Sequence, residues 1–128
     1  MIKCVFLLRR QPHLTREEFL AYWRNQHAKL ATEVSKTMRM KRYVQLHPLQ
    51  HPMGQLLAQS RGSKLMDWDG ITECWWDSFD DLALVAGSAG EIADKVLADE
   101  KSFVDLTRSE MMFFEENVVV GPETPSAA

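Results

Sequence analysis

The sequence predicts a single α+β domain in which an antiparallel sheet carries its helices on one face. The chain has 128 residues, which is room for one domain. Hydrophobic residues make up 45% and charged residues 26%, as in ordinary globular proteins. Segments with strand-like and helix-like patterns follow one another in the order β-α-β-β-α-β. The first strand is apolar on both of its faces, which indicates a sheet that is covered on both sides.

The N-terminal half of the chain supplies the first β-α-β segment. Residues 2–9 are rich in Val, Ile, Leu and Phe and are predicted to form a strand. Thr15 and Glu18 have the spacing of a capping box, so a helix is predicted to begin there. Apolar residues at helical spacing extend this helix to about Val34. The alternating pattern over 41–47 predicts a second strand.

The C-terminal half supplies the remaining elements. Residues 49–69 are predicted to form an irregular link that could hold a short helical turn around Met53, Leu56 and Leu57, and links of this length are often lids or binding loops. A third strand is predicted over 70–77. A helical region over 78–98 follows, interrupted at 87–90 by two glycines, and a last strand is predicted over 109–120.

This order is the split βαβ arrangement of ferredoxin-like folds. We assign residues 1–120 to this domain and residues 121–128 to a flexible C-terminal tail. The helices can cover one face of the sheet, and the chain has little left to cover the other. A homodimer is therefore predicted, in which two sheets pack face to face to form a dimeric α/β barrel.

Charge and composition argue against several classes of partner. The net charge is −3 and the only basic run is Arg39, Lys41 and Arg42, so binding to nucleic acid is not expected. No stretch approaches the roughly 18 apolar residues that a membrane span needs. The N-terminus lacks the pattern of a signal peptide. Cys4 and Cys74 lie outside any paired motif, so we expect free thiols and a cytoplasmic protein with no membrane partner.

Motifs for metals and cofactors are also missing from the sequence. There is no H-E-x-x-H, C-x-x-C, G-x-G-x-x-G or P-loop pattern. His47 and His51 are four residues apart, but Pro48 between them prevents pairing on a helix. We therefore predict that the protein holds neither a metal nor a cofactor.

The first helix carries the strongest candidate for chemistry. His27 lies four residues after Trp23 and eight after Phe19, which places it on the face of the helix toward the sheet. An imidazole there could transfer protons near neutral pH without a metal. A partly buried histidine that only binds a carbonyl would show the same spacing, so the spacing leaves both interpretations open.

Two strands and the link after one of them carry three further catalytic candidates. Cys74 could act as a nucleophile or an acid, or could be inert packing. Glu73 has the opposite parity, so only one of these two residues faces a pocket, and the sequence does not say which. Tyr43 shares a strand face with His47, and His51 begins the following link. These side chains could orient a substrate oxygen, although exposed residues at a sheet edge would show the same pattern.

Aromatic side chains are abundant, and most of them must be core. A few are expected to line an apolar pocket for a small, mostly apolar organic substrate. The predicted substrate-binding residues are Phe6, Tyr22, Trp23 and Trp76.

Taken together, these motifs resemble the EthD-like domains of the dimeric α/β barrel superfamily over about residues 3–120. The resemblance rests on Leu14-Thr15-Arg16-Glu17-Glu18-Phe19, Tyr22-Trp23-Arg24 with His27, Tyr43-Val44-Gln45, Gly70-Ile71-Thr72-Glu73-Cys74-Trp75-Trp76, Ala98-Asp99-Glu100 with Phe103 and Asp105, and Glu115-Glu116. The stretch Thr72-Glu73-Cys74-Trp75 is similar to one in the methylmuconolactone methylisomerases. The chain also resembles enzymes that cyclise, dehydrate or decarboxylate aromatic polyketides.

The resemblance implies a cofactor-independent isomerase or lyase that moves protons on a lactone, enol or aromatic polyketide-like substrate. His27 would act with help from Cys74, Tyr43 or His51. One alternative is a cofactor-independent monooxygenase acting on a phenol. The other is a non-catalytic protein that binds a small molecule in the same pocket.

Overall fold

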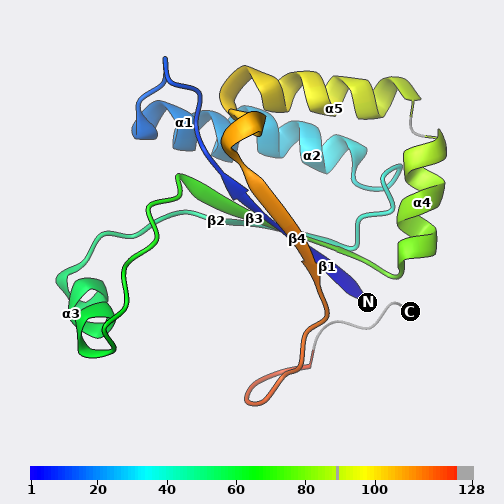
Figure 1. Cartoon of the computed structure of the whole chain (residues 1–128). Coiled ribbons are helices and arrows are strands. Elements are labelled where there is room, and N and C mark those ends of the chain that lie inside the picture. The colour runs from blue at the N-terminus through cyan, green and yellow to red at the C-terminus, as the bar shows by residue number, and fades with distance from the viewer. Residues whose placement is uncertain (89, 124–128) are drawn as a thin grey trace.

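The computed structural model of the chain describes residues 1–88 and 90–123. Its strands and α-helices, labelled in Figure 1, are β1 (Ile2–Leu8), α1 (Arg16–Tyr22), α2 (Ala28–Val34), β2 (Arg42–Leu46), α3 (Pro52–Ser60), β3 (Gly70–Trp76), α4 (Phe79–Ser88), α5 (Gly90–Phe103) and β4 (Glu110–Phe114). Between them lie the π-helical segment η1 (Trp23–His27) and the 3-10 turn η2 (Leu106–Arg108).

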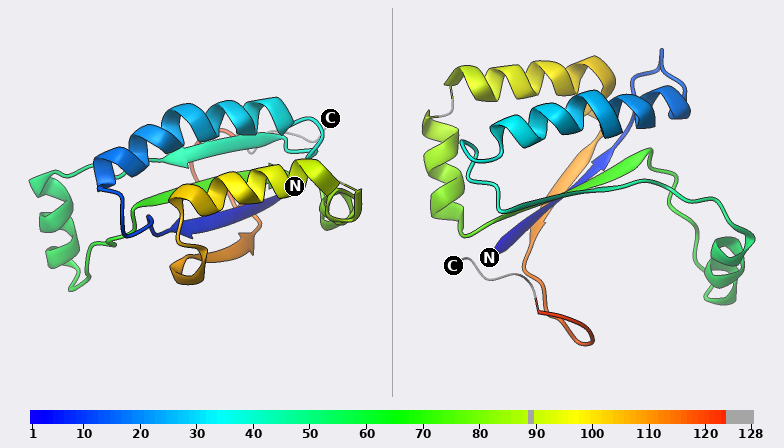
Figure 2. Two further views of the ribbon diagram at one scale, coloured as in Figure 1. Left: turned by 90° about the horizontal axis from the view of Figure 1, so that it is seen from above. Right: turned by 180° about the vertical axis from the view of Figure 1, so that it is seen from behind.

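The four strands form one antiparallel sheet in the order β2-β3-β1-β4. The helical run α1–η1–α2 and helix α5 lie side by side on one face of this sheet, and α4 stands at one end (Figure 1, Figure 2). This is the predicted α+β, ferredoxin-like fold. None of the described helices is long and apolar enough to cross a membrane.

Helix α1 begins where the capping box predicts it. The Thr15 hydroxyl accepts a hydrogen bond from the Glu18 amide at 3.1 Å, and the Glu18 carboxylate accepts one from the Thr15 amide at 2.9 Å. The helical run then continues through η1 and α2 to Val34, as the apolar periodicity predicts. The π-helical segment between Trp23 and His27 is the unexpected feature, and π-helical turns are frequent at functional sites.

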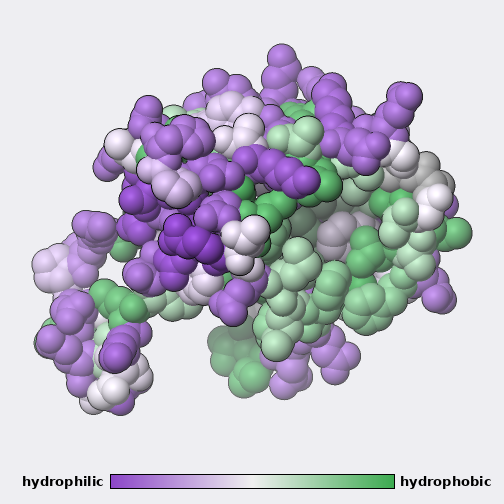
Figure 3. Space-filling view, turned by 45° about the horizontal axis from the view of Figure 1, so that its top comes forward, coloured by the Kyte–Doolittle hydropathy of each residue, from purple (hydrophilic) through white to green (hydrophobic). Residues whose placement is uncertain are grey.

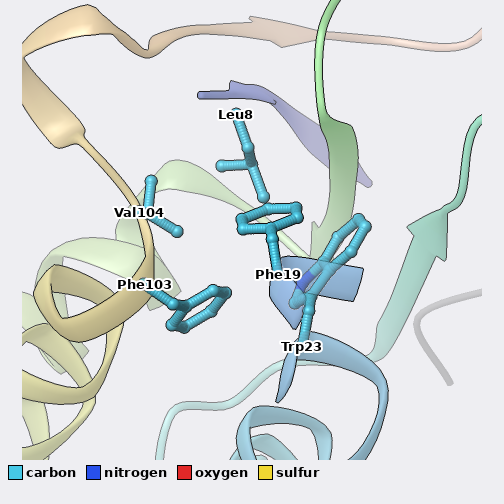
Figure 4. Packing of buried hydrophobic residues seen from close by; sticks show 5 residues of the cluster. All are labelled: Leu8, Phe19, Trp23, Phe103 and Val104. Atoms are coloured by element: carbon cyan, nitrogen blue, oxygen red, sulfur yellow. The ribbon is translucent and has the colours of Figure 1, made fainter. Parts of the chain in front are cut away.

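The most deeply buried core joins the helices to the end of β1. Five side chains converge there, as Figure 4 shows: Leu8, Phe19, Trp23, Phe103 and Val104. The ring of Phe19 lies 5.7 Å from that of Trp23 and 5.5 Å from that of Phe103, between centroids. This cluster fixes the spacing between η1, the end of α5 and the sheet.

Three predicted boundaries differ from the structure. The link over 49–69 contains the nine-residue helix α3, which is longer than the single turn expected around Met53, Leu56 and Leu57, projects away from the sheet and has no buried residue (Figure 1). Helix α5 continues to Phe103 rather than Ala98, since no helix-breaking residue intervenes. Strand β4 ends at Phe114, because Phe114 pairs with Lys3 and β1 offers almost no further partner.

Two predictions involve residues outside the described part of the chain. The expected helix interruption over 87–90 falls at the junction of α4 and α5, where residue 89 is not described. Of the predicted C-terminal tail 121–128, residues 124–128 are not described.

Candidate active site

A cavity of about 210 Å³ lies between the helices and the sheet. In the space-filling view a hollow opens among hydrophobic side chains below the helices (Figure 3). The cavity is lined by residues from β1, η1, α2, β2, β3, α5 and β4, from the loop after α2 and from the residue after α5: Cys4, Phe6, Leu8, Trp23, His27, Ala31, Val34, Met38, Met40, Tyr43, Thr72, Cys74, Trp76, Val96, Glu100, Phe103, Val104 and Met111. Its walls are therefore largely apolar, with a few polar groups.

His27 is held on the cavity wall by a carboxylate from another helix. Its Nδ1 lies 2.7 Å from Oδ2 of Asp99 on α5, and its ring packs 5.0 Å from that of Phe103. The Tyr22 hydroxyl donates a hydrogen bond to the other Asp99 oxygen, which fixes the carboxylate in turn. A carboxylate at Nδ1 favours the tautomer with its proton on that nitrogen and leaves Nε2 as a base.

The second nitrogen of His27 is available to a ligand. Nε2 has no hydrogen-bond partner among the residues that the structure describes. In the same part of the chain, the only fully buried side-chain polar atom without a partner is Oδ1 of Asp77. Nε2 therefore keeps access to the cavity that His27 lines.

Tyr43 presents a hydroxyl to the same cavity. Its oxygen accepts hydrogen bonds from Nε1 of Trp23 and from Nε2 of Gln45, both at 3.2 Å. Burial raises the pKa of the Tyr43 hydroxyl, so the group stays protonated at neutral pH. Because two donors already occupy the oxygen, its own O–H can be given to a substrate oxygen.

The sheet register settles which of Glu73 and Cys74 faces the cavity. Cys74 lines it and lies directly opposite Cys4 of β1, which also lines it. Glu73 points to the other face, where its carboxylate binds Lys3 Nζ at 2.7 Å. Burial raises the pKa of the Cys74 thiol to about 12. At neutral pH Cys74 is thus a neutral thiol, and the geometry gives no support to a thiolate nucleophile.

A carboxyl group also lies in this cavity. Glu100 follows Asp99 on α5 and lines the cavity. Burial, with a smaller contribution from the neighbouring Asp99, raises the pKa of Glu100 to about 7.

The comparison with known families decides the family of the chain. The sequence profile of the EthD domain matches residues 11–107, which is more than half of the chain. The chain belongs to the EthD domain family. A comparison with curated proteins gives no match.

Solved structures share the fold of this EthD-domain protein at low sequence identity. The Arabidopsis thaliana protein At3g17210 has a TM-score of 0.61 at 13% identity, covering 94% of this chain and 99% of that chain. A dimeric ferredoxin-like protein of unknown function from Bacteroides fragilis has a TM-score of 0.60 at 10% identity, covering 90% and 95%. SnoaB, a cofactor-independent oxygenase from Streptomyces nogalater, has a TM-score of 0.53 at 14% identity, covering 94% and 97%.

The cavity of the EthD domain contains most of the residues singled out from the sequence. The structure brings together His27, Cys74, Tyr43, Phe6, Trp23 and Trp76. Tyr22 does not line the cavity but supports it through Asp99. His51 lies outside the cavity: it is exposed, and its Nδ1 accepts the Met53 amide at 3.0 Å to cap α3. The prediction grouped His51 with Tyr43 because the two residues are close in sequence. In the structure the link runs away from the sheet, so the two side chains do not share a site.

Sequence reasoning did not identify Asp99 and Glu100 as site residues. The one signal was their place in the family-like stretch Ala98-Asp99-Glu100, in which Asp99 stands four residues before the aromatic Phe103. Asp99 lies 72 residues from His27 in sequence, so their contact depends on how α5 packs against η1. Among the described residues, no group of three or more His, Cys, Asp or Glu side chains is arranged to hold a metal ion.

Proposed function

We propose that this EthD-domain protein is a cofactor-independent isomerase or lyase that moves protons on a small, mostly apolar substrate in the cavity. The observation that carries the proposal is the His27–Asp99 pair, with Nε2 of His27 left free toward an apolar chamber. General acid–base catalysis by a positioned histidine contributes about 10²–10⁴-fold to a rate. No redox partner is needed for this chemistry.

The pair supports proton abstraction in a defined way. Nε2 of His27 removes a proton from an acidic carbon of the substrate, and Asp99 stabilises the imidazolium that forms. Tyr22 keeps the carboxylate from turning away. Tyr43 lines the same cavity, and in this proposal its hydroxyl binds the carbonyl or lactone oxygen next to that carbon.

The cavity walls indicate the class of substrate. Aromatic and aliphatic side chains dominate the lining, and the polar groups among them are His27, Tyr43, Thr72, Glu100 and the two cysteine thiols. A ligand with one or two oxygen functions on an apolar frame fits this distribution. Lactones, enols and aromatic polyketide-like molecules belong to that class.

We also propose that the protein acts as a homodimer. The sheet face away from the helices carries Val5, Leu7 and Ile71, none of which is fully buried in the single chain. A face of this kind needs a cover in a small α+β domain. The dimeric protein from Bacteroides fragilis with the same fold supports this assignment.

A second candidate is a cofactor-independent oxygenase. The same histidine base could deprotonate a phenol, whose anion can reduce oxygen directly, and SnoaB shares the fold. Oxygen uptake during turnover separates the two candidates, because proton transfer alone consumes none.

The test uses β-tetralone, an apolar bicyclic ketone with acidic C–H bonds next to its carbonyl. We expect the wild-type protein to catalyse exchange of these hydrogens for deuterium in heavy water, followed by proton NMR. His27→Asn should lower the exchange rate by about 10²–10⁴-fold. The matched control His13→Asn changes an exposed histidine and should leave the rate unchanged.

Two results would contradict the proposal. One is exchange that persists in His27→Asn within about threefold of wild type, which corresponds to less than about 1 kcal/mol. The other is oxygen consumption in step with loss of a phenolic probe such as 1-naphthol, which would favour the oxygenase.

A further inference from the structure

Glu100 differs from His27 and Tyr43, the other strongly polar groups of the cavity, in having no side chain that holds it. Nδ1 of His27 is bound by Asp99, and the Tyr43 oxygen is bound by Trp23 and Gln45. The carboxyl of Glu100 lines the cavity without a hydrogen bond or ion pair to any residue that the structure describes. Buried carboxyl groups are normally paired, since an unpaired one costs folding free energy.

We propose that Glu100 is a catalytic residue of this cavity, which donates a proton to the substrate oxygen while His27 acts on carbon. This inference rests on the proposed proton-transfer function. It adds the general acid that the His27–Asp99 pair lacks.

The surroundings of Glu100 explain why it keeps a proton. Four other titratable groups face the cavity: the thiols of Cys4 and Cys74 on the sheet, Tyr43 on β2 and His27 on η1. Asp99 is the neighbour of Glu100 on its own helix. The thiols and the phenol are neutral, and His27 is already bound to Asp99.

No permanent cation faces the cavity from the lining residues to stabilise a Glu100 carboxylate. Burial therefore dominates and raises the pKa of Glu100 to about 7. A general acid is most effective when its pKa lies near the working pH.

The step can be written with all protons placed. Nε2 of His27 takes a proton from the carbon next to a carbonyl, and the C–H electron pair becomes a C=C bond. The carbonyl π electrons move to oxygen, which receives the Glu100 proton, so the products are an enol, an imidazolium and a carboxylate. In the return step the imidazolium protonates carbon and the enol O–H gives its proton back to Glu100. Return of the proton to the same carbon gives hydrogen exchange, and return to a different carbon of a conjugated enol gives an isomer. Neither outcome needs an oxidant or reductant.

A difference infrared titration tests the protonation of Glu100 without any substrate. Wild-type minus Glu100→Gln spectra between pH 5 and 9 should contain the carbonyl band of a protonated carboxyl, which disappears with a midpoint near pH 7. The control Glu91→Gln, an exposed residue at the start of the same helix, should show no such band. A Glu100 carboxyl that is ionised throughout this range would overturn the inference.

The catalytic part is tested with β-tetralone exchange as a function of pH. Glutamine can still donate a hydrogen bond but cannot release a proton. We therefore expect Glu100→Gln to bind the probe with unchanged affinity, measured by tryptophan fluorescence, and to exchange at least about 10-fold more slowly. The wild-type rate should fall above about pH 7, and this decline should be absent in Glu100→Gln.

The outcomes separate the two proposals. If wild type exchanges the probe and Glu100→Gln keeps both its rate and its pH profile, the role of Glu100 is wrong while the His27 function stands. If wild type does not exchange the probe at all, the proton-transfer function fails, and the catalytic role of Glu100 fails with it even if the infrared titration shows a neutral acid.

Discussion

The two faces of the sheet hold their polar groups in different ways. On the face toward the helices, Cys4, Tyr43 and Cys74 border the cavity as neutral groups. On the opposite face, Lys3 binds the carboxylates of Glu73 and Glu116 at 2.7 and 3.5 Å. Neighbouring residues on one strand thus enter unlike environments, because side chains alternate across a sheet.

This difference predicts on which face of the sheet a substitution alters catalysis and on which face it alters only stability. The Lys3–Glu73 pair is largely buried, with side chains 16% and 15% exposed, but neither residue lines the cavity, so this pair acts on stability alone. The His27–Asp99 pair is similarly buried, with side chains 7% and 20% exposed, but it orients a base that lines the cavity. Substitutions should therefore matter most on the helix-facing side, and the predictions below test this from the largest effect to the smallest.

The largest expected effect is loss of the carboxylate that holds His27. Asp99→Asn cannot stabilise an imidazolium and can present its amide N–H to Nδ1, which would favour the wrong tautomer. We expect β-tetralone exchange to fall by about 10²–10⁴-fold, or about 3–5 kcal/mol in activation free energy. The exposed Asp94 on the same helix offers a control, and Asp94→Asn should exchange at the wild-type rate. Equal rates in the two variants would mean that Asp99 does not orient the base.

The next effect concerns the dependence of stability on pH. The folded pKa of Glu100 is raised from 4.5 to about 7, so the stability linked to this group is fully present below pH 4.5 and lost as pH rises through 7. Between pH 4.5 and 8, wild type should lose up to about 3 kcal/mol of unfolding free energy relative to Glu100→Gln. Urea unfolding of both proteins at fixed concentration measures the difference. Parallel curves across this range would show that Glu100 is not buried as described.

A third effect tests the packing beneath the site. A Cβ added at Gly70 on β3 would lie 2.4 Å from Cζ3 of Trp23, which is fully buried, so the indole would have to move. We expect Gly70→Ala to lower the unfolding free energy by about 1–3 kcal/mol through overpacking. Gly87→Ala is the control, because nothing lies within 4 Å of its added Cβ, and it should be neutral or slightly stabilising. A Gly70→Ala protein as stable as wild type would mean that Trp23 can relocate freely.

The same contrast explains how much of the site could be predicted from sequence. The face of His27 followed from its spacing to Trp23 and Phe19, because a continuous helical run fixes which residues share a side. The choice between Glu73 and Cys74 could not be made, since alternation separates them without saying which face the helices cover. The register of β3 against β1 sets Cys74 opposite Cys4, and this pairing shows that Cys74 is the residue on the face toward the helices.

Asp99 and α3 show two further limits of sequence reasoning. The contact between Asp99 and His27 joins distant segments, and local patterns carry no information on how α5 packs against η1. Helix α3 carries Met53, Leu56 and Leu57 at the spacing of an apolar stripe, yet all three are exposed in the single chain, so the stripe predicts a helix without saying where that helix lies.

The smallest predicted effect lies on the open face of the sheet. Leu7 on β1 points to that side and pairs with Ile71 and Glu110 across the sheet. If a second copy covers this face, Leu7→Lys removes apolar area from the interface at about 25 cal/mol per Å² and adds a charge there. We expect a dimer dissociation constant at least about 10-fold higher, with a melting temperature of the separated chain close to wild type. Leu57→Lys, on the exposed α3 outside the sheet, should leave association unchanged. Light scattering over a dilution series measures both variants, and a wild-type mass near 14.7 kDa at micromolar concentration would contradict the homodimer itself.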